Sequence, residues 1–276
     1  CNYYYDCSVK LLSHFRAKPM QIHQVYTQSV LRNFTYLIEL DDKTAIVLDP
    51  WDESIVNKLL IEKNLHLTTI INTHEHWDHV QGNLALVEQH QCEVWAHENG
   101  QGKIPGLTRT LTEGELITLE AETNLRVLDT PGHTLAHLCF LVQVNGKTEA
   151  IFTGDTLFNA GVGHCRSGNV DLLYKTVAEQ FYTLEDHVKV YPGHEYLENN
   201  LNFTLNLEPS NEDAKVWLEL ATKTDPCITP LITTIADEKK FNTFFRLDNQ
   251  EIRKGIGGLN TDKEVFTALR ALRDNW

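Results

Sequence analysis

The chain has 276 residues, of which 42% are hydrophobic, and its formal net charge is −14 at pH 7. This length and apolar content are enough to bury an enzyme-sized core, whereas no uninterrupted apolar run approaches the roughly 20 residues of a transmembrane helix. Because nucleic-acid binding depends on clustered lysine and arginine, the acidic balance excludes a general nucleic-acid surface. We therefore expect a globular protein that binds neither nucleic acid nor a membrane.

The first 19 residues differ from the rest of the chain. The only methionine is Met20, and periodic patterns begin directly after it, so we interpret residues 1–19 as an extension or remnant outside the fold. They carry three basic residues against one acid, which weakly resembles an organelle-targeting leader, but they lack the apolar core of a secretory signal. The six cysteines show no C-x-x-C spacing and are expected to be reduced. The cytoplasm is the expected location, and organelle targeting remains open.

After Met20, strand and helix patterns alternate. β-branched and aromatic runs predict strands, and apolar residues at helical spacing, such as Val56, Leu59 and Leu60, predict helices. The expected strands are 22–26, 36–40, 45–48, 68–72, 93–96, 115–119, 125–128, 138–144, 150–152 and 188–191, and the helices among them are 53–64, 83–90 and 171–182. Beyond 191 we expect helices at 195–206, 211–223 and 261–273 and little strand. These patterns predict an α+β domain over 20–194 and a small helical domain over 195–276.

Four residues that can bind metal lie within six positions, at His74, His76, Asp78 and His79. They follow the buried strand expected at 68–72, and the loops after such strands hold active sites in α/β sheets. Divalent metals accept histidine nitrogen and aspartate oxygen, and catalytic sites leave a position open for water. The close spacing suits two ions rather than one.

Three later segments add one candidate ligand each. They are Pro131–Thr134 with His133, Phe152–Thr156 with Asp155, and Tyr191–Glu195 with His194. Each segment lies at or just after the end of an expected strand. A single Gly-His or Gly-Asp pair is usually a turn or a helix cap, but together with the earlier motif these residues supply what a two-metal site still needs.

The order H-x-H-x-D-H, then His, Asp and His, resembles that of the metallo-β-lactamase superfamily from Met20 to about His194. The resemblance implies a four-layer αββα sandwich, in which two mixed sheets lie face to face with helices outside. It also implies two ligand sets bridged by Asp155. These are His74, His76 and His133 for one divalent metal, and Asp78, His79 and His194 for the other.

Asp49 follows the strand expected at 45–48 and matches a family aspartate that supports the ligands without touching the metal. The alternative is an ordinary turn residue. Zinc is the expected metal at both positions, and iron or manganese also suits a mixed histidine and aspartate set.

Within the superfamily the chain is similar to the glyoxalase II branch, the hydroxyacylglutathione hydrolases. The similarity lies in Tyr191–Tyr196 followed by Asn200–Phe203 and Leu207–Pro209, in Asn242–Arg246, where Thr243 replaces the family's proline, and in the basic tail Leu269–Asp274. It implies that Arg270 and Arg273, which share one helix face, grip the carboxylates of glutathione. The alternative is a solvated basic helix end.

The segment Gly161–Gly168 departs from the family pattern. Family members usually have a Gly-Cys-Gly-(Lys/Arg)-Phe-(Tyr/Phe)-Glu-Gly run here, whose basic and aromatic residues contact glutathione. In this chain His164 stands at the basic position and Arg166 at an aromatic one. We expect both to bind substrate, with an altered preference for the thiol or the acyl group.

The resemblance implies hydrolysis of S-(2-hydroxyacyl)glutathione thioesters, such as S-D-lactoylglutathione, to a 2-hydroxy acid and glutathione. A hydroxide held between the metals would attack the acyl carbon, with Asp78 and Asp155 as the catalytic carboxylates. The nearest rival is a mononuclear-iron persulfide dioxygenase, which shares the fold and ligand order but has a shorter C-terminal region. Lactonase, β-lactamase and noncatalytic metal-binding proteins are further alternatives. We expect a monomer.

Overall fold

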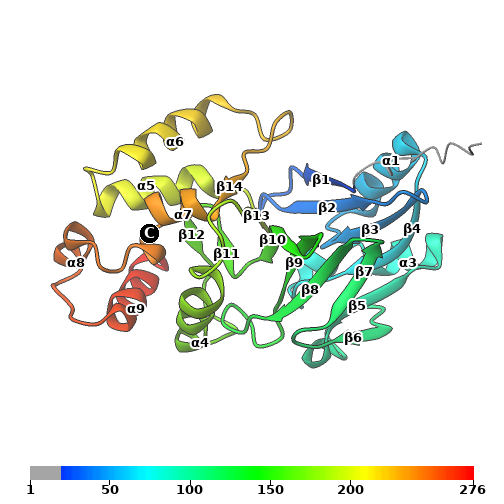
Figure 1. Cartoon of the computed structure of the whole chain (residues 1–276), viewed down its shortest axis with the longest axis horizontal. Coiled ribbons are helices and arrows are strands. Elements are labelled where there is room, and N and C mark those ends of the chain that lie inside the picture. The colour runs from blue at the N-terminus through cyan, green and yellow to red at the C-terminus, as the bar shows by residue number, and fades with distance from the viewer. Residues whose placement is uncertain (1–19) are drawn as a thin grey trace, which may run out of the picture.

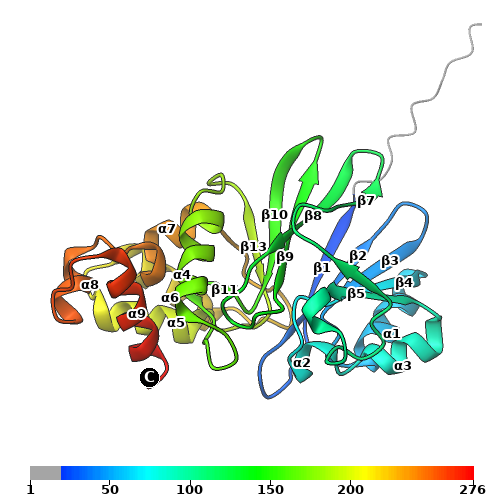
Figure 2. The same cartoon turned by 90° about the horizontal axis from the view of Figure 1, so that it is seen from below.

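Two six-stranded mixed sheets lie face to face at the centre of the molecule, which a computed structural model describes over residues 20–276 (Figures 1 and 2). The first sheet contains, in order, β1 (Gln21–Tyr26), β2 (Phe34–Glu39), β3 (Thr44–Leu48), β4 (His66–Ile71), β5 (Glu93–His97) and β6 (Arg109–Leu111). The second contains β14 (Thr233–Thr234), β13 (Lys189–Pro192), β10 (Lys147–Gly154), β9 (Leu138–Val144), β8 (Thr123–Asp129) and β7 (Leu116–Glu120). The interpretation of residues 1–19 lies outside the described residues.

Both sheets bury apolar side chains on both faces, because successive side chains of a strand point to opposite sides. In β2, Tyr36 and Ile38 enter the core between the sheets, while Leu37 packs on the outer face of the first sheet. In β9, Phe140 lies between the sheets and Leu141 lies on the outer face of the second sheet. Strands of this kind need helices over both outer faces.

Helices provide that cover and complete the expected four layers. On the first sheet, α1 (Glu53–Lys63) and α3 (Asn83–His90) pack Val56, Leu60 and Leu86 against the strands. Asp52 caps α1 by accepting a hydrogen bond from Ser54 N, and Asn64 ends it in a left-handed conformation. The second sheet is covered by α4 (Val170–Thr176) and by the helical C-terminal region (Figure 2).

Besides β14, the described C-terminal region contains five helices and one 3₁₀ turn. They are α5 (Leu197–Leu207), α6 (Glu212–Lys223), α7 (Ile235–Phe241), the turn Thr243–Phe245, α8 (Gln250–Gly255) and α9 (Asp262–Arg273). Two motifs of the family resemblance meet here, because Arg246 Nε donates to Glu208 Oε2 at 2.9 Å. Among residues 20–276, no helix is long and apolar enough to cross a bilayer.

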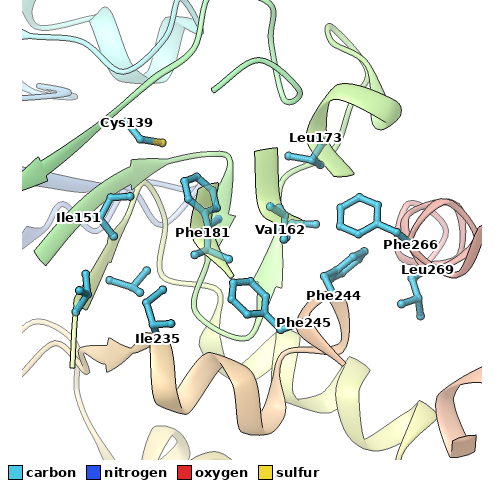
Figure 3. Packing of buried hydrophobic residues seen from close by; sticks show 14 of the residues in the cluster. Cys139, Ile151, Val162, Leu173, Phe181, Ile235, Phe244, Phe245, Phe266 and Leu269 are labelled. Atoms are coloured by element: carbon cyan, nitrogen blue, oxygen red, sulfur yellow. The ribbon is translucent and has the colours of Figure 1, made fainter. Parts of the chain in front are cut away.

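The largest apolar cluster joins this region to the second sheet. Figure 3 shows Phe244, Phe266 and Leu269 beside Val162 and Leu173. This cluster continues across the boundary that we expect near residue 194, so the two proposed domains share it, whereas two further apolar clusters lie wholly within residues 20–194.

Several elements differ from their sequence-based expectation. The helix expected at 171–182 is α4 followed by a π-helical segment, Val177–Phe181. The short helices α7 and α8, the strands β6 and β14, and the hairpin of β11 (Leu157–Phe158) and β12 (Gly161–Val162) were not expected at all. Each of these is too short to show a clear apolar period.

Candidate metal centre

The candidate ligands lie at one edge of the sandwich, just beyond strand ends from both sheets. The pair β3 and β4 runs parallel in the first sheet, as β10 and β13 do in the second. His74 follows β4, His133 follows β8, Asp155 follows β10 and His194 follows β13. Residues that are 120 positions apart in the chain therefore converge on one point (His74 and His194).

The second half of the first motif lies on a four-residue helix, α2 (Trp77–Val80). The chain is extended at His76 and turns helical at Trp77. His74 and His76 consequently face one group of ligands, whereas Asp78 and His79 on α2 face another.

The first group contains three histidines and one aspartate: His74, His76, His133 and Asp155. His76 Nδ1 lies 3.0 Å from His74 Nε2 and 2.9 Å from His133 Nε2. Asp155 Oδ2 lies 3.5 Å from His133 Nε2 and 4.0 Å from His74 Nε2. His76 Nδ1 faces the Nε2 atoms of both other histidines, so the three imidazoles cannot all hydrogen-bond to one another through these nitrogens. A cation shared by the three rings, or additional protons, would satisfy them.

The second group contains Asp78, His79 and His194. His79 Nε2 and His194 Nε2 lie 3.2 Å apart, and each of these atoms lies 3.4 Å from Asp78 Oδ2. Asp155 borders this group as well, because its Oδ2 is 3.2 Å from His194 Nε2 and its Oδ1 is 3.3 Å from His79 Nε2. Asp155 is thus the residue common to both groups.

The two groups fit a pair of divalent ions. Nitrogen and oxygen ligands at about 2.0–2.1 Å from a tetrahedral ion lie about 3.3–3.4 Å from one another, which is close to the separations above. Asp155 Oδ1 is buried and, among the described residues, accepts no hydrogen bond of ordinary geometry, as expected of an atom reserved for a cation. The donor set is mixed nitrogen and oxygen, which divalent metals accept.

Every histidine of the two groups has its other ring nitrogen fixed by an outer partner. His133 Nδ1 is 2.7 Å from His164 O, and His194 Nδ1 is 2.8 Å from Leu31 O. A backbone carbonyl can only accept, so each Nδ1 carries the proton and each Nε2 offers its lone pair to the centre.

His76 and His74 rely on hydroxyls in the same way. Ser167 Oγ is 2.9 Å from His76 Nε2 and donates to His133 O at 3.5 Å. Thr73 Oγ1 is 2.9 Å from His74 Nδ1 and donates to Asp49 Oδ2 at 2.7 Å. Because each hydroxyl proton is already used, each hydroxyl accepts the N–H of its histidine.

Asp49 ties the two halves of the first motif together. Its Oδ2 lies 3.0 Å from His79 Nδ1, and its Oδ1 accepts from Thr73 N at 2.8 Å. The carboxylate is buried and forms a third group of possible ligands with His74 and His79, but both of its oxygens already accept hydrogen bonds from the chain, from Thr73 and from His79 Nδ1. This placement matches a residue that supports the ligands rather than an ordinary turn residue.

The electrostatic balance of the site favours bound positive charge. Burial holds the pKa of His74 well below its usual range and lowers that of His133 to about 3. Burial also acts against a charged His79, but Asp155 and Asp49 raise the pKa of His79 well above its usual range. Burial acts against a charged Asp155, yet His194 and His79 hold its pKa well below the usual range. His74 and His133 are therefore held neutral beside an anionic Asp155, as metal binding requires, while the carboxylates around His79 favour a positive charge there.

Two glycines allow this close approach. A Cβ on Gly193 would lie 2.2 Å from Asp155 Oδ1. Gly154 has φ +46°, and a Cβ there would lie 2.6 Å from Thr73 Oγ1. Glycine therefore precedes Asp155 and His194 because a larger residue would not fit at these two positions.

A cleft of about 440 Å³ opens directly onto the ligands. His164 and Arg166 line it, as we expect of substrate-binding residues, together with Tyr196, whose ring stacks on His194 with a centroid distance of 4.9 Å. Leu31 and Trp77 form part of its apolar wall. The cleft can hold a reacting group next to both ligand sets.

Arg270 and Arg273 are placed differently from the expectation that both meet one anionic ligand. Arg270 is buried, and its Nη1 donates to Val162 O at 2.7 Å and to Gly163 O at 3.2 Å. Arg273 is more exposed and donates to Asn200 Oδ1 at 3.2 Å. Neither residue lines the cleft. Substrate contacts by Arg270 and Arg273 stay predictions. Both Nη groups of Arg270 have partners within the chain, whereas its buried Nε has none among the described residues.

Four further residues at the centre were missed by the sequence-based analysis. Asn33 Nδ2 donates to Asp78 Oδ2 at 2.8 Å, His137 Nε2 accepts from Asp155 N at 3.2 Å, and Ser167 and Tyr196 have the contacts described above. Ser167 and Tyr196 stand in motifs that were already singled out, and His137 lies four positions after His133. Asn33, in a turn before β2, has no sequence signal.

Comparisons with known proteins agree with this geometry. A family model described as the metallo-beta-lactamase superfamily matches residues 29–194, and one described as the hydroxyacylglutathione hydrolase C-terminus matches residues 195–276. The chain is 40% identical over 266 residues to a hydroxyacylglutathione hydrolase of Nitrosococcus oceani, covering 93% of this chain and 100% of that protein.

Two further comparisons extend the set. A protein of Arabidopsis thaliana named hydroxyacylglutathione hydrolase cytoplasmic is 33% identical, with 88% of this chain and 95% of that protein covered. Among solved structures, ETHE1 from Myxococcus xanthus superposes with a TM-score of 0.63 at 27% identity, covering 92% of this chain and 98% of that one.

Proposed function

This chain belongs to the hydroxyacylglutathione hydrolase family of the metallo-β-lactamase superfamily, and from that membership we propose how its residues carry out the reaction. The protein is a metal-dependent hydrolase of the glyoxalase II type. The observation that carries the proposal is the convergence of two ligand groups on Asp155 at the floor of an open cleft.

We assign His74, His76 and His133 to one metal ion, Asp78, His79 and His194 to a second, and Asp155 to both. Support comes from the separations between their donor atoms and from the fixed outer nitrogens of the histidines. Bound divalent ions supply a water of pKa about 7 and polarise a carbonyl oxygen. Zinc is the proposed metal, and the donor set also suits iron or manganese.

The chain's own groups orient the attacking water. Asn33 donates to Asp78 Oδ2 and holds that carboxylate toward the centre. Asp155 is fixed by its backbone N–H, which His137 Nε2 accepts at 3.2 Å. We assign to Asp78 the acceptance of a hydrogen bond from the water. A thiol of pKa roughly 8.5 leaves readily as thiolate, so no strong general acid is required.

Substrate binding is assigned to the cleft. A glutathione thioester carries two carboxylates and one ammonium group, and Arg166 and His164 at the cleft wall can meet a carboxylate. Arg273 lies on the helix beyond them and is proposed to receive a second one. The small 2-hydroxyacyl group would lie against Leu31 and Trp77, next to both ligand groups.

The remaining assignments are also proposals. A cytoplasmic location is supported by the Arabidopsis thaliana relative, whose name includes that compartment. The net charge of −14 supports a protein that does not bind nucleic acid. We propose a monomer that acts on a small-molecule thioester.

The direct test supplies S-D-lactoylglutathione to the zinc-loaded protein and measures both free thiol and D-lactate. Equal amounts of the two products are expected, with the rate lost in His76→Ala. A parallel sample of iron-loaded protein, with both glutathione persulfide and the thioester supplied in turn and an oxygen electrode, tests the dioxygenase alternative. Oxygen consumption without thioester hydrolysis would overturn the assignment.

A further inference from the structure

Glu75 stands between two candidate ligands, His74 and His76, but belongs to no group of candidate ligands itself. Its Oε2 accepts a hydrogen bond from Thr134 Oγ1 at 2.9 Å. Thr134 directly follows His133, the third histidine of the first ligand group. A hydrogen bond between residues 59 positions apart therefore joins the segment that carries two of the ligands to the turn that carries the third.

The turn around His133 is built on Thr134, which is fully buried. Thr134 O accepts from Gly132 N at 2.9 Å, which closes the turn over His133, and Thr134 Oγ1 accepts from Ala136 N at 3.3 Å. The single proton of this hydroxyl goes to Glu75. Without Glu75 the hydroxyl would lose the acceptor that the structure gives it, and a buried donor without an acceptor is unfavourable.

Lys103 is the second partner of Glu75. Its Nζ lies 3.5 Å from Glu75 Oε1, and 60% of the Lys103 side chain is exposed, against 14% of the Glu75 side chain. Exposed ion pairs contribute little to stability because water and salt screen them. The hydrogen bond to Thr134, which is largely shielded from water, is therefore the contact that can fix the position of Glu75.

The first ligand group tolerates little change in the separation of its parts. His76 Nδ1 lies 2.9 Å from His133 Nε2 and 3.0 Å from His74 Nε2. Metal–ligand distances are kept within about 0.2 Å of their ideal values. A small displacement of the His133 turn would therefore weaken the hold of all three histidines on a shared ion.

We propose that Glu75 is a positioning residue, whose hydrogen bond to Thr134 holds His133 at the distance from His74 and His76 that one metal ion requires. The inference rests on the proposed function in treating these three histidines as ligands of one ion. Neither Glu75 nor Thr134 lines the cleft, so the role concerns metal binding rather than contact with substrate.

The effect should be confined to one ion. The outer partners of the second ligand group are Asn33, Asp49 and Leu31, and within the described part of the chain none of them contacts Glu75 or Thr134. Loss of an outer partner typically weakens metal binding by 10- to 100-fold.

For Glu75 we expect a fall of about tenfold, at the low end of that range. Glu75 acts on His133 only through Thr134, and Ser167 still links the two parts of the group. Ser167 Oγ lies 2.9 Å from His76 Nε2 and 3.5 Å from His133 O.

The test titrates cobalt into each metal-free protein without substrate, because cobalt d–d absorption reports both affinity and ligand geometry. Glu75→Ala removes the acceptor, and Thr134→Val removes the donor with little change in side-chain shape. Glu75→Gln keeps an amide oxygen that can accept from Thr134. Lys103→Met is the matched control, because it removes only the exposed partner of Glu75. Cooperative thermal unfolding of each protein shows that the fold is kept.

In Glu75→Ala and in Thr134→Val, we expect one of the two cobalt ions to bind about tenfold more weakly, with altered d–d bands. At a limiting zinc concentration kcat should fall while KM stays nearly unchanged. Glu75→Gln should recover most of the affinity, and Lys103→Met should bind cobalt as wild type does. The double variant should lose no more than either single variant, because both changes remove the same hydrogen bond.

Wild-type cobalt affinity in both Glu75→Ala and Thr134→Val would overturn the proposal. Equal losses in Glu75→Gln and Glu75→Ala would overturn it as well, since the charge of Glu75 rather than its hydrogen bond would then be the cause. Where Glu75→Ala does not fold, Thr134→Val and Glu75→Gln decide. Failure of the proposed function is distinguishable, because it would show as absent thioester hydrolysis in the wild-type protein while the cobalt differences between variants persisted.

Discussion

Asp49 accepts hydrogen bonds from both halves of the metal motif, through His79 Nδ1 and the Thr73 backbone and hydroxyl. Its φ of +50° places it in the left-handed region, where asparagine is tolerated better than alanine. Asp49→Asn therefore removes the charge without adding backbone strain. We expect metal affinity to fall by about tenfold or more, because the charged partner of His79 is lost.

The measurement is the metal retained after dialysis against a graded series of chelator concentrations, compared with wild type. Asp52→Asn is the matched control, because it changes a nearby aspartate that caps α1 and touches no candidate ligand. Equal retention by Asp49→Asn and wild type would contradict the supporting role of Asp49.

Glu238 is a fully buried carboxyl of α7, with Thr233, Asn242 and the Ala160 N–H as donors. Burial raises the pKa of Glu238 from its ordinary value near 4.5 to about 7, although the three donors act in the opposite direction. Between these values the folded protein holds a proton that the unfolded chain has lost. Stability should therefore fall as pH rises from about 4.5 to about 7.

Glu238→Gln removes this titration and keeps the size of the side chain. We expect the free energy of unfolding to fall less between pH 5 and pH 7.5 in the variant than in wild type, by on the order of a few kcal/mol. Urea unfolding at a series of pH values measures it, and the difference between the two proteins cancels other titrating groups. Identical pH slopes would show that Glu238 ionises normally in the folded state.

At the residue scale, the sequence identifies ligands better than the groups that hold them. His74, His133 and His194 could be predicted because imidazole side chains carry the metal chemistry themselves. Their partners could not, because His164 and Leu31 act through backbone carbonyls, which every residue possesses. The contacts of Arg270 with Val162 O and Gly163 O could not be predicted either, because the partners are again backbone carbonyls.

Helix α9 carries Arg270 and begins with a capping box, in which Thr261 accepts from Glu264 N and Glu264 accepts from Thr261 N. Thr261→Ala removes the side-chain acceptor and should lower stability by about 1 kcal/mol. Thr267→Ala, on the same helix, removes only a hydroxyl that donates back to Lys263 O and should change stability little. Denaturant unfolding compares the two, and equal losses would mean that the cap contributes nothing specific.

Long elements with a clear period were predicted well, and short ones were not. The strand at 138–144 and the helix at 83–90 agree with β9 and α3 in both bounds, because β9 has an almost continuous apolar run and α3 has Leu86 and Val87 facing the core. The hairpin of β11 and β12 has two residues in each strand and shows no period. It nevertheless leads the chain from Asp155 to His164 at the cleft, so an element next to the site had no sequence signal.

The whole molecule has a continuous core across the proposed boundary at residues 194 and 195. Ile151 and Val190 of the second sheet belong to the same apolar cluster as Phe203 and Phe266 of the helical region. A fragment of residues 20–194 would expose this surface. We expect it to bind a hydrophobic dye and to unfold without cooperativity, as measured by fluorescence and by circular dichroism during urea titration.

The full chain should show neither property. Cooperative unfolding of the fragment with a wild-type midpoint would mean that the catalytic part is an independent domain, in contrast to the shared core.

The central claim is that two metal ions held by the two ligand groups hydrolyse the thioester. The most direct measurement removes all metal with a chelator, then returns zinc stepwise while S-D-lactoylglutathione hydrolysis is followed. We predict no hydrolysis in the metal-free protein and full recovery as bound zinc reaches two ions per chain. Wild-type rates in the fully stripped protein, or full recovery in the His76→Ala variant, would contradict the account.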